Sequence, residues 1–246
     1  MRGLHGKIIL GAALIALSAA MFFLQVKIFH DERDTFFYLF QDLAFVPIQV
    51  LLVTVIVDQV IRIRERLSMM TKLNMVIGTF FSEVGTKLMK SLAGFDSHFE
   101  QIRSDFMVTG EWTDQRFSSA IKRVGSYDFR IDYMRSDLAA LKALLAGKRD
   151  FLLRLLENQN LLEHETFTEL LWALFHLTEE LLAREDVTRL SHADGNHIAG
   201  DIRRAYVILI AEWLAYMKHL KKEYPYLFSL AVRTNPSDPN APVVVT

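Results

Sequence analysis

Two long apolar runs occupy the first sixty residues of the chain. They extend over residues 8–26 and 35–57, and the charged segment 30–34 separates them. The hydrocarbon core of a bilayer, about 30 Å thick, requires about 20 helical residues at a rise of 1.5 Å each. The first run reaches this length without a charged side chain, whereas the second includes Asp42. The pattern predicts a transmembrane hairpin over residues 1–61, with spans at about 8–29 and 36–61.

A single apolar stripe continues beyond the second run. Leu73, Ile77, Phe80 and Val84 recur at intervals of three or four residues, which predicts one helix over 62–94 that continues from the second span. This stripe fits packing within its own domain or against the same helix of another subunit. Lys87 occupies the next position of the seam, so packing within the domain is favoured.

The remaining pattern is helical up to a short C-terminal tail. It predicts helices over 97–107, 137–146, 151–156, 166–183 and 194–224, with Gly147 as a helix stop, whereas 110–133 shows only a weak helical pattern. The segment 205–217 is apolar except for Glu212, and it is too short for a third membrane span, so we expect a buried central helix. Three prolines lie among small residues in 234–246, which predicts a disordered tail.

The fold class follows from these periods. No segment alternates polar and β-branched residues between hairpin turns, so nothing indicates a sheet. We predict an all-α protein in which an N-terminal two-helix transmembrane hairpin precedes a cytoplasmic multi-helix domain over 95–233.

Composition narrows the classes of partner. The formal net charge of the 246 residues is −1 and the basic residues do not form one long run, so we expect no nucleic-acid partner. Cysteine is absent, which excludes disulfides, thiolate metal sites and cysteine nucleophiles.

Basic residues flank the two apolar runs on their outer sides. They are Arg2 and Lys7 before the first run, and Arg62, Arg64, Arg66 and Lys72 after the second. Because such residues tend to remain in the cytoplasm, we expect a multi-pass protein of the cell membrane with both termini cytoplasmic. The second group also suits anionic lipid headgroups. The competing interpretation, a signal peptide cleaved near 18–20, is disfavoured because the apolar run continues to Leu24.

Two sets of residues within the predicted spans deserve separate hypotheses. Asp42 and Gln49 lie two turns apart on one helical face with Pro47 between them, so they would line a polar pore if several subunits assembled. Alternatively, Asp42 lies at headgroup depth. In the first span, Ala12, Ala16 and Ala20 are spaced for close helix packing, either with the second span or with another copy.

Possible metal ligands cluster before the last long helix. His192, His197 and Asp201 are the candidates, and Glu169 with His176 would be a second ligand pair. The simpler interpretation is structural: Asp194 caps the helix and Asp201 pairs with Arg203 or Arg204. We therefore expect no bound metal and no cofactor. For Glu212 we expect a buried ion pair with an Arg, or a hydrogen bond to Trp172 or Tyr206.

The chain contains no phosphate loop, nucleophile elbow, paired-histidine protease helix or dinucleotide fingerprint. The leading hypothesis is a non-enzymatic interaction, scaffolding or signal-relay module at the cytoplasmic face. Two alternatives stay open, a small homo-oligomeric ion channel and a membrane-tethered metal-dependent enzyme. The expected partners are the lipid bilayer and either a second copy of the chain or a cytoplasmic protein.

Overall fold

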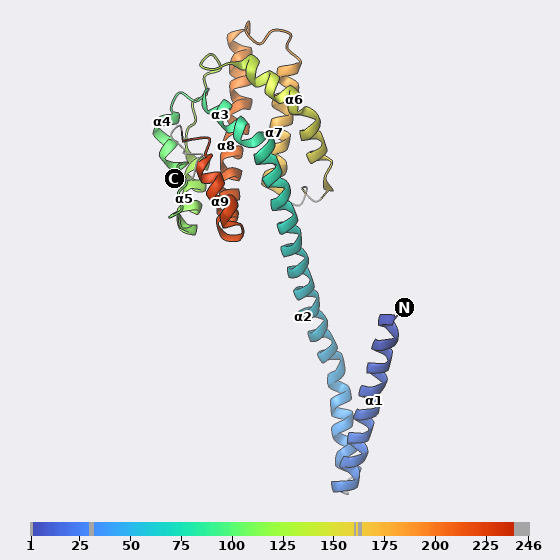
Figure 1. The fold of residues 1–246 in the computed structure, drawn as a ribbon. Coiled ribbons are helices and arrows are strands. Elements are labelled where there is room, and N and C mark those ends of the chain that lie inside the picture. The colour runs from blue at the N-terminus through green and yellow to red at the C-terminus, as the bar shows by residue number, and fades with distance from the viewer. Residues whose placement is uncertain (1, 30–31, 160, 162–163, 239–246) are drawn as a thin grey trace. The chain divides into compact units, whose positions relative to one another are not determined.

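A computed structural model describes residues 2–29, 32–159, 161 and 164–238 (Figure 1). Its described elements are helical: α1 (Arg2–Phe29), α2 (Glu32–Phe80), the π-helical turn η1 (Phe81–Gly85), α3 (Thr86–Ala93), α4 (Phe99–Ile102), the 3₁₀ turn η2 (Arg103–Asp105), α5 (Asp114–Ser126), α6 (Leu138–Leu156), α7 (Glu165–Leu182), α8 (His192–Glu223) and α9 (Pro225–Arg233). An isolated antiparallel bridge joins Asp96 and Ile131, and no strand occurs in the described part of the chain. The all-α prediction is therefore confirmed.

The chain divides into two compact units, residues 1–66 and 67–246. Unit 1 consists of α1 and the first part of α2. Among the described residues, one helical segment, Phe36–Glu65, is long and apolar enough to cross a membrane. Its most apolar 18 residues have a mean hydropathy of 2.1, and all of the segment is exposed. A shorter apolar helix covers Ile15–Ile28. The side chains of 2–12 lie outside the described ones, and the predicted first span at 8–29 begins among them.

Unit 2 has an enclosed apolar core organised around α8. This helix contacts α3, α5, α7 and α9 (Figure 1). Its long apolar segment is buried because neighbouring helices cover it on several sides, as the sequence predicted for a central helix. Phe167 of α7 and Phe80 of α2 meet edge to face with ring centroids 5.2 Å apart, which ties α7 to the end of α2.

A π-helical turn interrupts the helix that leads from α2 into α3. The backbone N–H of Thr86 and its Oγ1 both donate to the carbonyl of Phe81, five residues earlier. Gly85 lies where this turn passes the aromatic core, because a Cβ at this position would approach Phe81 Cδ1 to 2.6 Å. The extra residue of the turn thus lets Phe80 and Phe81 both enter the core.

Two expectations about helix ends were wrong. Gly147 does not stop a helix, because α6 continues through it to Leu156. The buried leucines of α6, which include Leu141, Leu145 and Leu152, form a continuous face whose packing outweighs the cost of about 1 kcal/mol for one Gly. The helix predicted over 97–107 is shorter, since α4 ends at Ile102 and one 3₁₀ turn follows.

The described start of the C-terminal tail contacts the rest of unit 2, and the disorder predicted for 234–246 stays a prediction. Asn235 is buried and its Nδ2 donates to the carbonyl of Phe106 over 2.8 Å, while Arg103 Nε donates to the carbonyl of Ser237 over 2.9 Å. These hydrogen bonds provide partners for polar groups of the tail. The proline-rich composition of the tail did not predict these contacts. Residues 239–246 lie outside the described part of the chain.

Candidate functional site

Helices α7 and α8 bring two pairs of ligand-type side chains together. His176 and Glu180 lie one turn apart on α7, and His197 and Asp201 lie one turn apart on α8. A spacing of four residues places each pair on one face of its helix. Because α7 and α8 pack against each other in unit 2, the two pairs meet at their interface.

The reactive atoms of the four side chains face one another at similar distances. Asp201 Oδ2 lies 3.5 Å from the Nε2 atoms of both His176 and His197. Glu180 approaches the same nitrogens, with Oε1 3.9 Å from His176 Nε2 and Oε2 3.6 Å from His197 Nε2. One ligand atom from each of His176, His197 and Asp201 falls within 4.8 Å of the other two.

Asp201 is the buried member of this group. Its side chain is only 4% exposed, whereas those of His176 and His197 are 46% and 54% exposed. Oδ1 faces the guanidinium of Arg204 at 3.5 Å. Oδ2 is buried without a hydrogen-bond donor among the described residues, although it faces the two imidazoles. A buried carboxylate oxygen left in this way is costly unless a cation or a proton compensates it.

Arg184 positions the acidic side of the cluster. Its guanidinium donates to Glu180 Oε2 over 2.7 Å and to both carboxylate oxygens of Asp194. The hydrogen bond from Arg184 is the main reason that the pKa values of Glu180 and Asp194 lie below their ordinary values. Glu180 is thereby held as a carboxylate with Oε1 facing His176.

The chemistry of this arrangement follows from its atoms. Two imidazole nitrogens and the Asp201 carboxylate lie within 4.8 Å of one another, with Glu180 beside the imidazoles, and both donor types bind first-row transition metals. The exposure of the imidazoles leaves one side of the cluster open to water. Metal-free, the same atoms can share protons between histidine and carboxylate.

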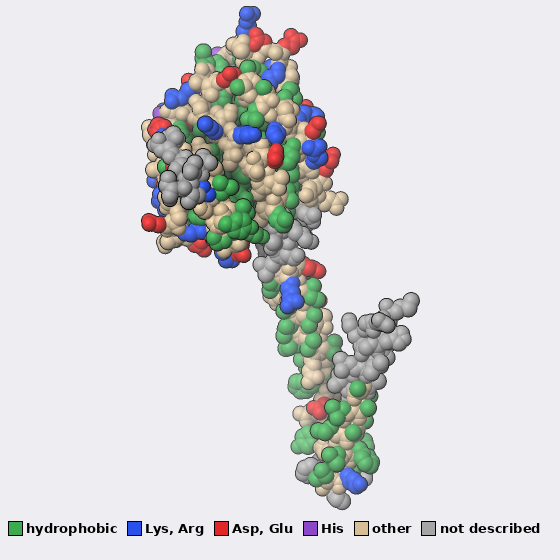
Figure 2. Space-filling view, viewed as in Figure 1, with side chains coloured by type: hydrophobic (Ala, Val, Ile, Leu, Met, Phe, Trp, Pro, Cys, Tyr) green, Lys and Arg blue, Asp and Glu red, His purple; other side chains and the backbone are tan. Residues whose placement is uncertain are grey.

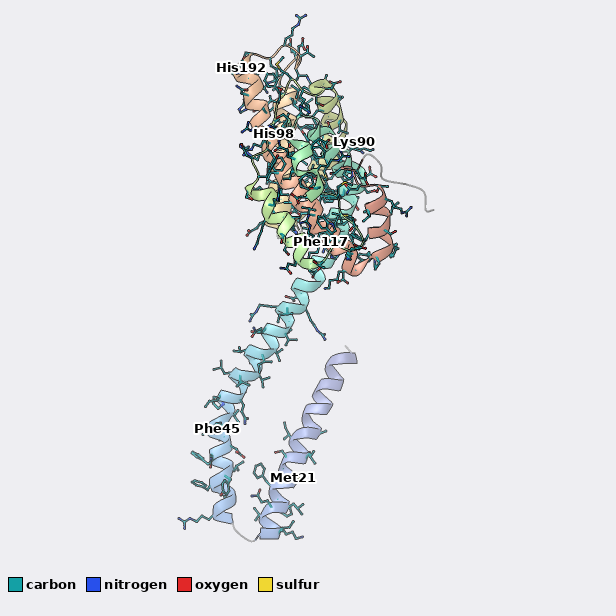
Figure 3. All side chains as sticks on the ribbon, turned by 90° about the vertical axis from the view of Figure 1, so that its left-hand side faces the viewer. Met21, Phe45, Lys90, His98, Phe117 and His192 are labelled. Atoms are coloured by element: carbon teal, nitrogen blue, oxygen red, sulfur yellow. The ribbon has the colours of Figure 1, made fainter. Side chains whose placement is uncertain are left out.

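Only some of the metal ligands predicted from the sequence lie in this cluster. His197 and Asp201 lie in the cluster together with His176, which the sequence offered only as part of a second pair. His192 lies at the start of α8 (Figure 3), where its Nε2 is 3.2 Å from Asn196 Nδ2. Glu169 is exposed, seven residues before His176 on α7.

Sequence reasoning missed Glu180 and Arg184 as members of this site. The repeated spacing of four residues in His176–Glu180 and His197–Asp201 was the available signal. Asp194 is not the helix cap that we expected, because Ser191 Oγ accepts from the Asp194 backbone N–H and is the N-cap of α8.

A second group of titratable side chains surrounds a cavity of about 280 Å³. Its lining includes Glu212, His164, His219 and Asn74. Burial raises the pKa of the Glu212 carboxyl, while a hydrogen bond from Thr166 and the nearby His164 oppose that shift. The expected partners of Glu212, an Arg, Trp172 or Tyr206, are thus replaced by Thr166 and His164. Burial lowers the pKa of His219, whose Nδ1 lies 3.3 Å from Asn74 Nδ2.

The candidate residues of unit 1 lie on exposed helix surface. Asp42, Pro47 and Gln49 are exposed on α2, and Ala16 and Ala20 are exposed on α1. Arg62 and Arg64 are exposed as well, whereas the side chains of Ala12, Arg66 and Lys72 lie outside the described ones. The pore and the close helix packing concern assemblies or membranes and stay predictions.

Comparison with known proteins gives matches to both parts of the chain. A family model described as the C-terminal helical domain of MJ1433 matches residues 69–233, and the N-terminal helical domain of MJ1433 matches residues 2–61. A protein of Methanocaldococcus jannaschii, described as the uncharacterized protein MJ1433, is 43% identical over 231 residues, which cover 94% of this chain and 93% of that protein. No solved structure matches the chain.

Proposed function

This chain belongs to the MJ1433 family, and from that premise we propose that it is an integral membrane protein that holds a helical interaction domain at the cytoplasmic face. The two family models, which match residues 2–61 and 69–233, agree closely with the division of the chain at residue 66. This agreement supports separate roles for the two units, with unit 1 as the anchor and unit 2 as the working domain.

One observation carries the proposal of an anchor. The 30-residue segment Phe36–Glu65 contains an 18-residue stretch with a mean hydropathy of 2.1, and none of its residues is buried. At 1.5 Å per residue this segment reaches about 45 Å, which exceeds the hydrocarbon thickness of about 30 Å. Green hydrophobic side chains cover this stretch of α2 in the space-filling view (Figure 2). Exposure of these side chains to water costs about 25 cal/mol of free energy for each Å² of apolar surface, which favours their transfer into a bilayer.

We propose that α1 supplies the second crossing of a hairpin. It has 28 residues, and only residues 30 and 31 separate it from α2. In this hairpin Asp42 lies near the outer interface, because Asp42 is close in sequence to the charged residues that connect α1 and α2. The basic residues at the other ends of the two helices, which include Arg62 and Arg64, favour cytoplasmic termini.

Membrane extraction tests the anchor. The full-length chain is expressed, membranes are isolated, and one half is washed with alkaline carbonate while the other is treated with detergent. We expect the chain to stay in the carbonate pellet and to dissolve in detergent, as a spanning protein does. Release by carbonate alone would contradict the anchor.

An exposed apolar surface on α9 supports an interaction role for unit 2. Tyr226 is 70% exposed, and Leu227 and Leu230 beside it are also exposed. Such side chains grouped on one short helix are typical of a protein contact.

The test is affinity capture of full-length protein in mild detergent, compared with a Tyr226→Ser, Leu230→Ser variant and with Met134→Ser as an exposed apolar control. Loss of a specific partner from the double variant alone is expected. Repeated recovery of the chain by itself would count against the interaction role.

A further inference from the structure

We propose that His176, His197 and Asp201, completed by Glu180, form a binding site for one zinc ion between α7 and α8. All four residues belong to unit 2. The inference therefore goes beyond the membrane proposal and stands or falls separately from it.

The distances between the donor atoms fit a shared metal better than hydrogen bonds. Asp201 Oδ2 is 3.5 Å from each imidazole Nε2, and Glu180 Oε1 is 3.9 Å from His176 Nε2. These values exceed the range of about 2.7–3.2 Å for N–H···O hydrogen bonds. Ligands bound at about 2.1 Å in a tetrahedron are separated by about 3.4 Å. Asp201 Oδ2 lies close to this distance from both imidazole nitrogens, and one ligand atom from each of His176, His197 and Asp201 falls within 4.8 Å of the other two.

The buried carboxylate provides an independent reason. Asp201 has a side chain that is 96% removed from solvent, since only 4% is exposed, and its Oδ2 is aimed between two imidazoles. Among the described residues no hydrogen-bond donor reaches this oxygen. A divalent ion bound between these side chains would compensate the charge on Asp201 Oδ2. It would also bind the lone pairs of the two imidazole nitrogens, which have no such partner in a cluster without a metal.

The donor types select the metal. Calcium and magnesium prefer oxygen ligands alone, so two imidazoles argue against them. Imidazole with carboxylate suits zinc, and zinc commonly takes four ligands from this set. Glu180 is the fourth ligand, because Arg184 holds its Oε2 and leaves Oε1 toward His176. Fixing a ligand carboxylate from outside in this way is usual at metal sites.

The arrangement on the helices supports a built site. Each helix supplies two ligands one turn apart, His176 with Glu180 and His197 with Asp201. Sites of this kind form in helical bundles where facing helices project ligands toward one another. The helix backbones set the four Cα positions, so little chain entropy would be lost when the ion binds.

The experiment measures zinc bound by the full-length chain in detergent. The purified protein is stripped with a chelator, dialysed against micromolar ZnCl₂ and assayed by elemental analysis, with circular dichroism to confirm helical folding. We expect one zinc per chain. Asp201→Asn and His176→Gln each remove a ligand, so they should weaken zinc binding by more than about 100-fold, and Glu180→Gln by about 10- to 100-fold.

His192→Gln is the matched control, because it replaces a histidine of the same helix that lies outside the cluster. It should bind zinc as the unaltered chain does. A second readout is the visible spectrum of the protein loaded with Co²⁺, in which intense bands indicate tetrahedral coordination. These bands should vanish with Asp201→Asn and persist with His192→Gln.

Two results would overturn the proposal. One is a folded full-length chain that takes up no zinc. The other is zinc binding that Asp201→Asn and His176→Gln leave unchanged, which would show the metal to be bound elsewhere. A failure of the membrane extraction test would leave the zinc result untouched, since each experiment reads a different unit.

Discussion

The two units of the chain differ in whether their apolar side chains are buried or exposed. In unit 2, Phe80, Phe167 and Trp213 are buried in a core that neighbouring helices enclose. In unit 1, Phe45 on α2 and Met21 on α1 project from their helices (Figure 3), and Leu51 on α2 is exposed as well. Similar residue types thus form an enclosed core in one unit and an exposed helix surface in the other.

This contrast shows that composition alone does not decide where an apolar helix belongs. The apolar centre of α8 and the apolar run of α2 are both helical, but flanking charges and length separate them. The α8 run is short and ends at charged residues, so the protein itself buries it. Phe36–Glu65 is long enough to cross a bilayer, and the described part of the chain buries none of its residues.

The largest expected effect comes from placing charge in the exposed run. In the double variant Leu51→Asp, Val55→Asp, each carboxylate costs about 3 kcal/mol in the centre of a membrane helix. We expect the variant to lose co-flotation with lipid vesicles, which the unaltered chain should show. Met134→Asp is the control, since it puts the same charge on an exposed apolar position of unit 2. Equal flotation of all three proteins would break the contrast between the units.

Truncating a core side chain should have the next largest effect. Phe167 is fully buried and packs against Phe80, so Phe167→Ala should lower the free energy of unfolding by about 3–5 kcal/mol. The measurement is the urea dependence of circular dichroism in detergent. Phe45→Ala removes the same ring from exposed α2 and should leave the urea transition of unit 2 unchanged. A similar loss from both variants would refute the distinction between enclosed and exposed aromatics.

Two glycines of α8 sharpen the argument about packing. A Cβ at Gly195 would approach the ring of Tyr133 to 2.2 Å, whereas at Gly200 it would meet nothing within 4 Å. Gly195→Ala should therefore lower stability by about 1–3 kcal/mol, because the ring must move. Gly200→Ala should raise stability by about 0.5–1 kcal/mol through helix propensity. Thermal unfolding of the two variants checks both signs, and a gain at Gly195 would contradict the close contact.

The smallest expected effect is a dependence of stability on pH. Burial raises the pKa of Glu212, so the folded state holds this proton more tightly than the unfolded state. Stability therefore falls as pH rises from the ordinary carboxyl pKa through the raised value. Glu212→Gln should remove this slope and raise stability at neutral pH, whereas Glu169→Gln on exposed surface should do neither. Urea unfolding from pH 4 to pH 8 measures the slope, and an unchanged slope in Glu212→Gln would exclude this role.

The helical fold was largely predictable because its signals are local. Apolar spacing indicated the region of α7 and the central burial of α8. The end of α6 was missed because packing of its leucine face outweighs the local preference of Gly147. The contact of Asn235 with the carbonyl of Phe106 could not be predicted from the sequence, because it joins segments 129 residues apart.

Only half of the candidate site was predictable, because local spacing can be read from the sequence and contacts between distant segments cannot. His197 and Asp201 share a helix, so their spacing was readable from the sequence. His176 and Glu180 reach them only when α7 packs on α8, and no periodicity fixes that register. His192 was chosen for its nearness in sequence, but it does not belong to the group of ligand-type side chains that His176, His197 and Asp201 form.

The topology of unit 1 tests the central claim most directly. Because the chain has no cysteine, single substitutions Gly3→Cys, Arg33→Cys and Ser119→Cys give unique labelling sites. Cells that express each full-length variant are treated with a membrane-impermeant maleimide before and after permeabilisation. We predict that Arg33→Cys reacts in intact cells, and that Gly3→Cys and Ser119→Cys react only after permeabilisation. If all three react only after permeabilisation, the segment 30–34 does not reach the outside and the membrane hairpin is contradicted.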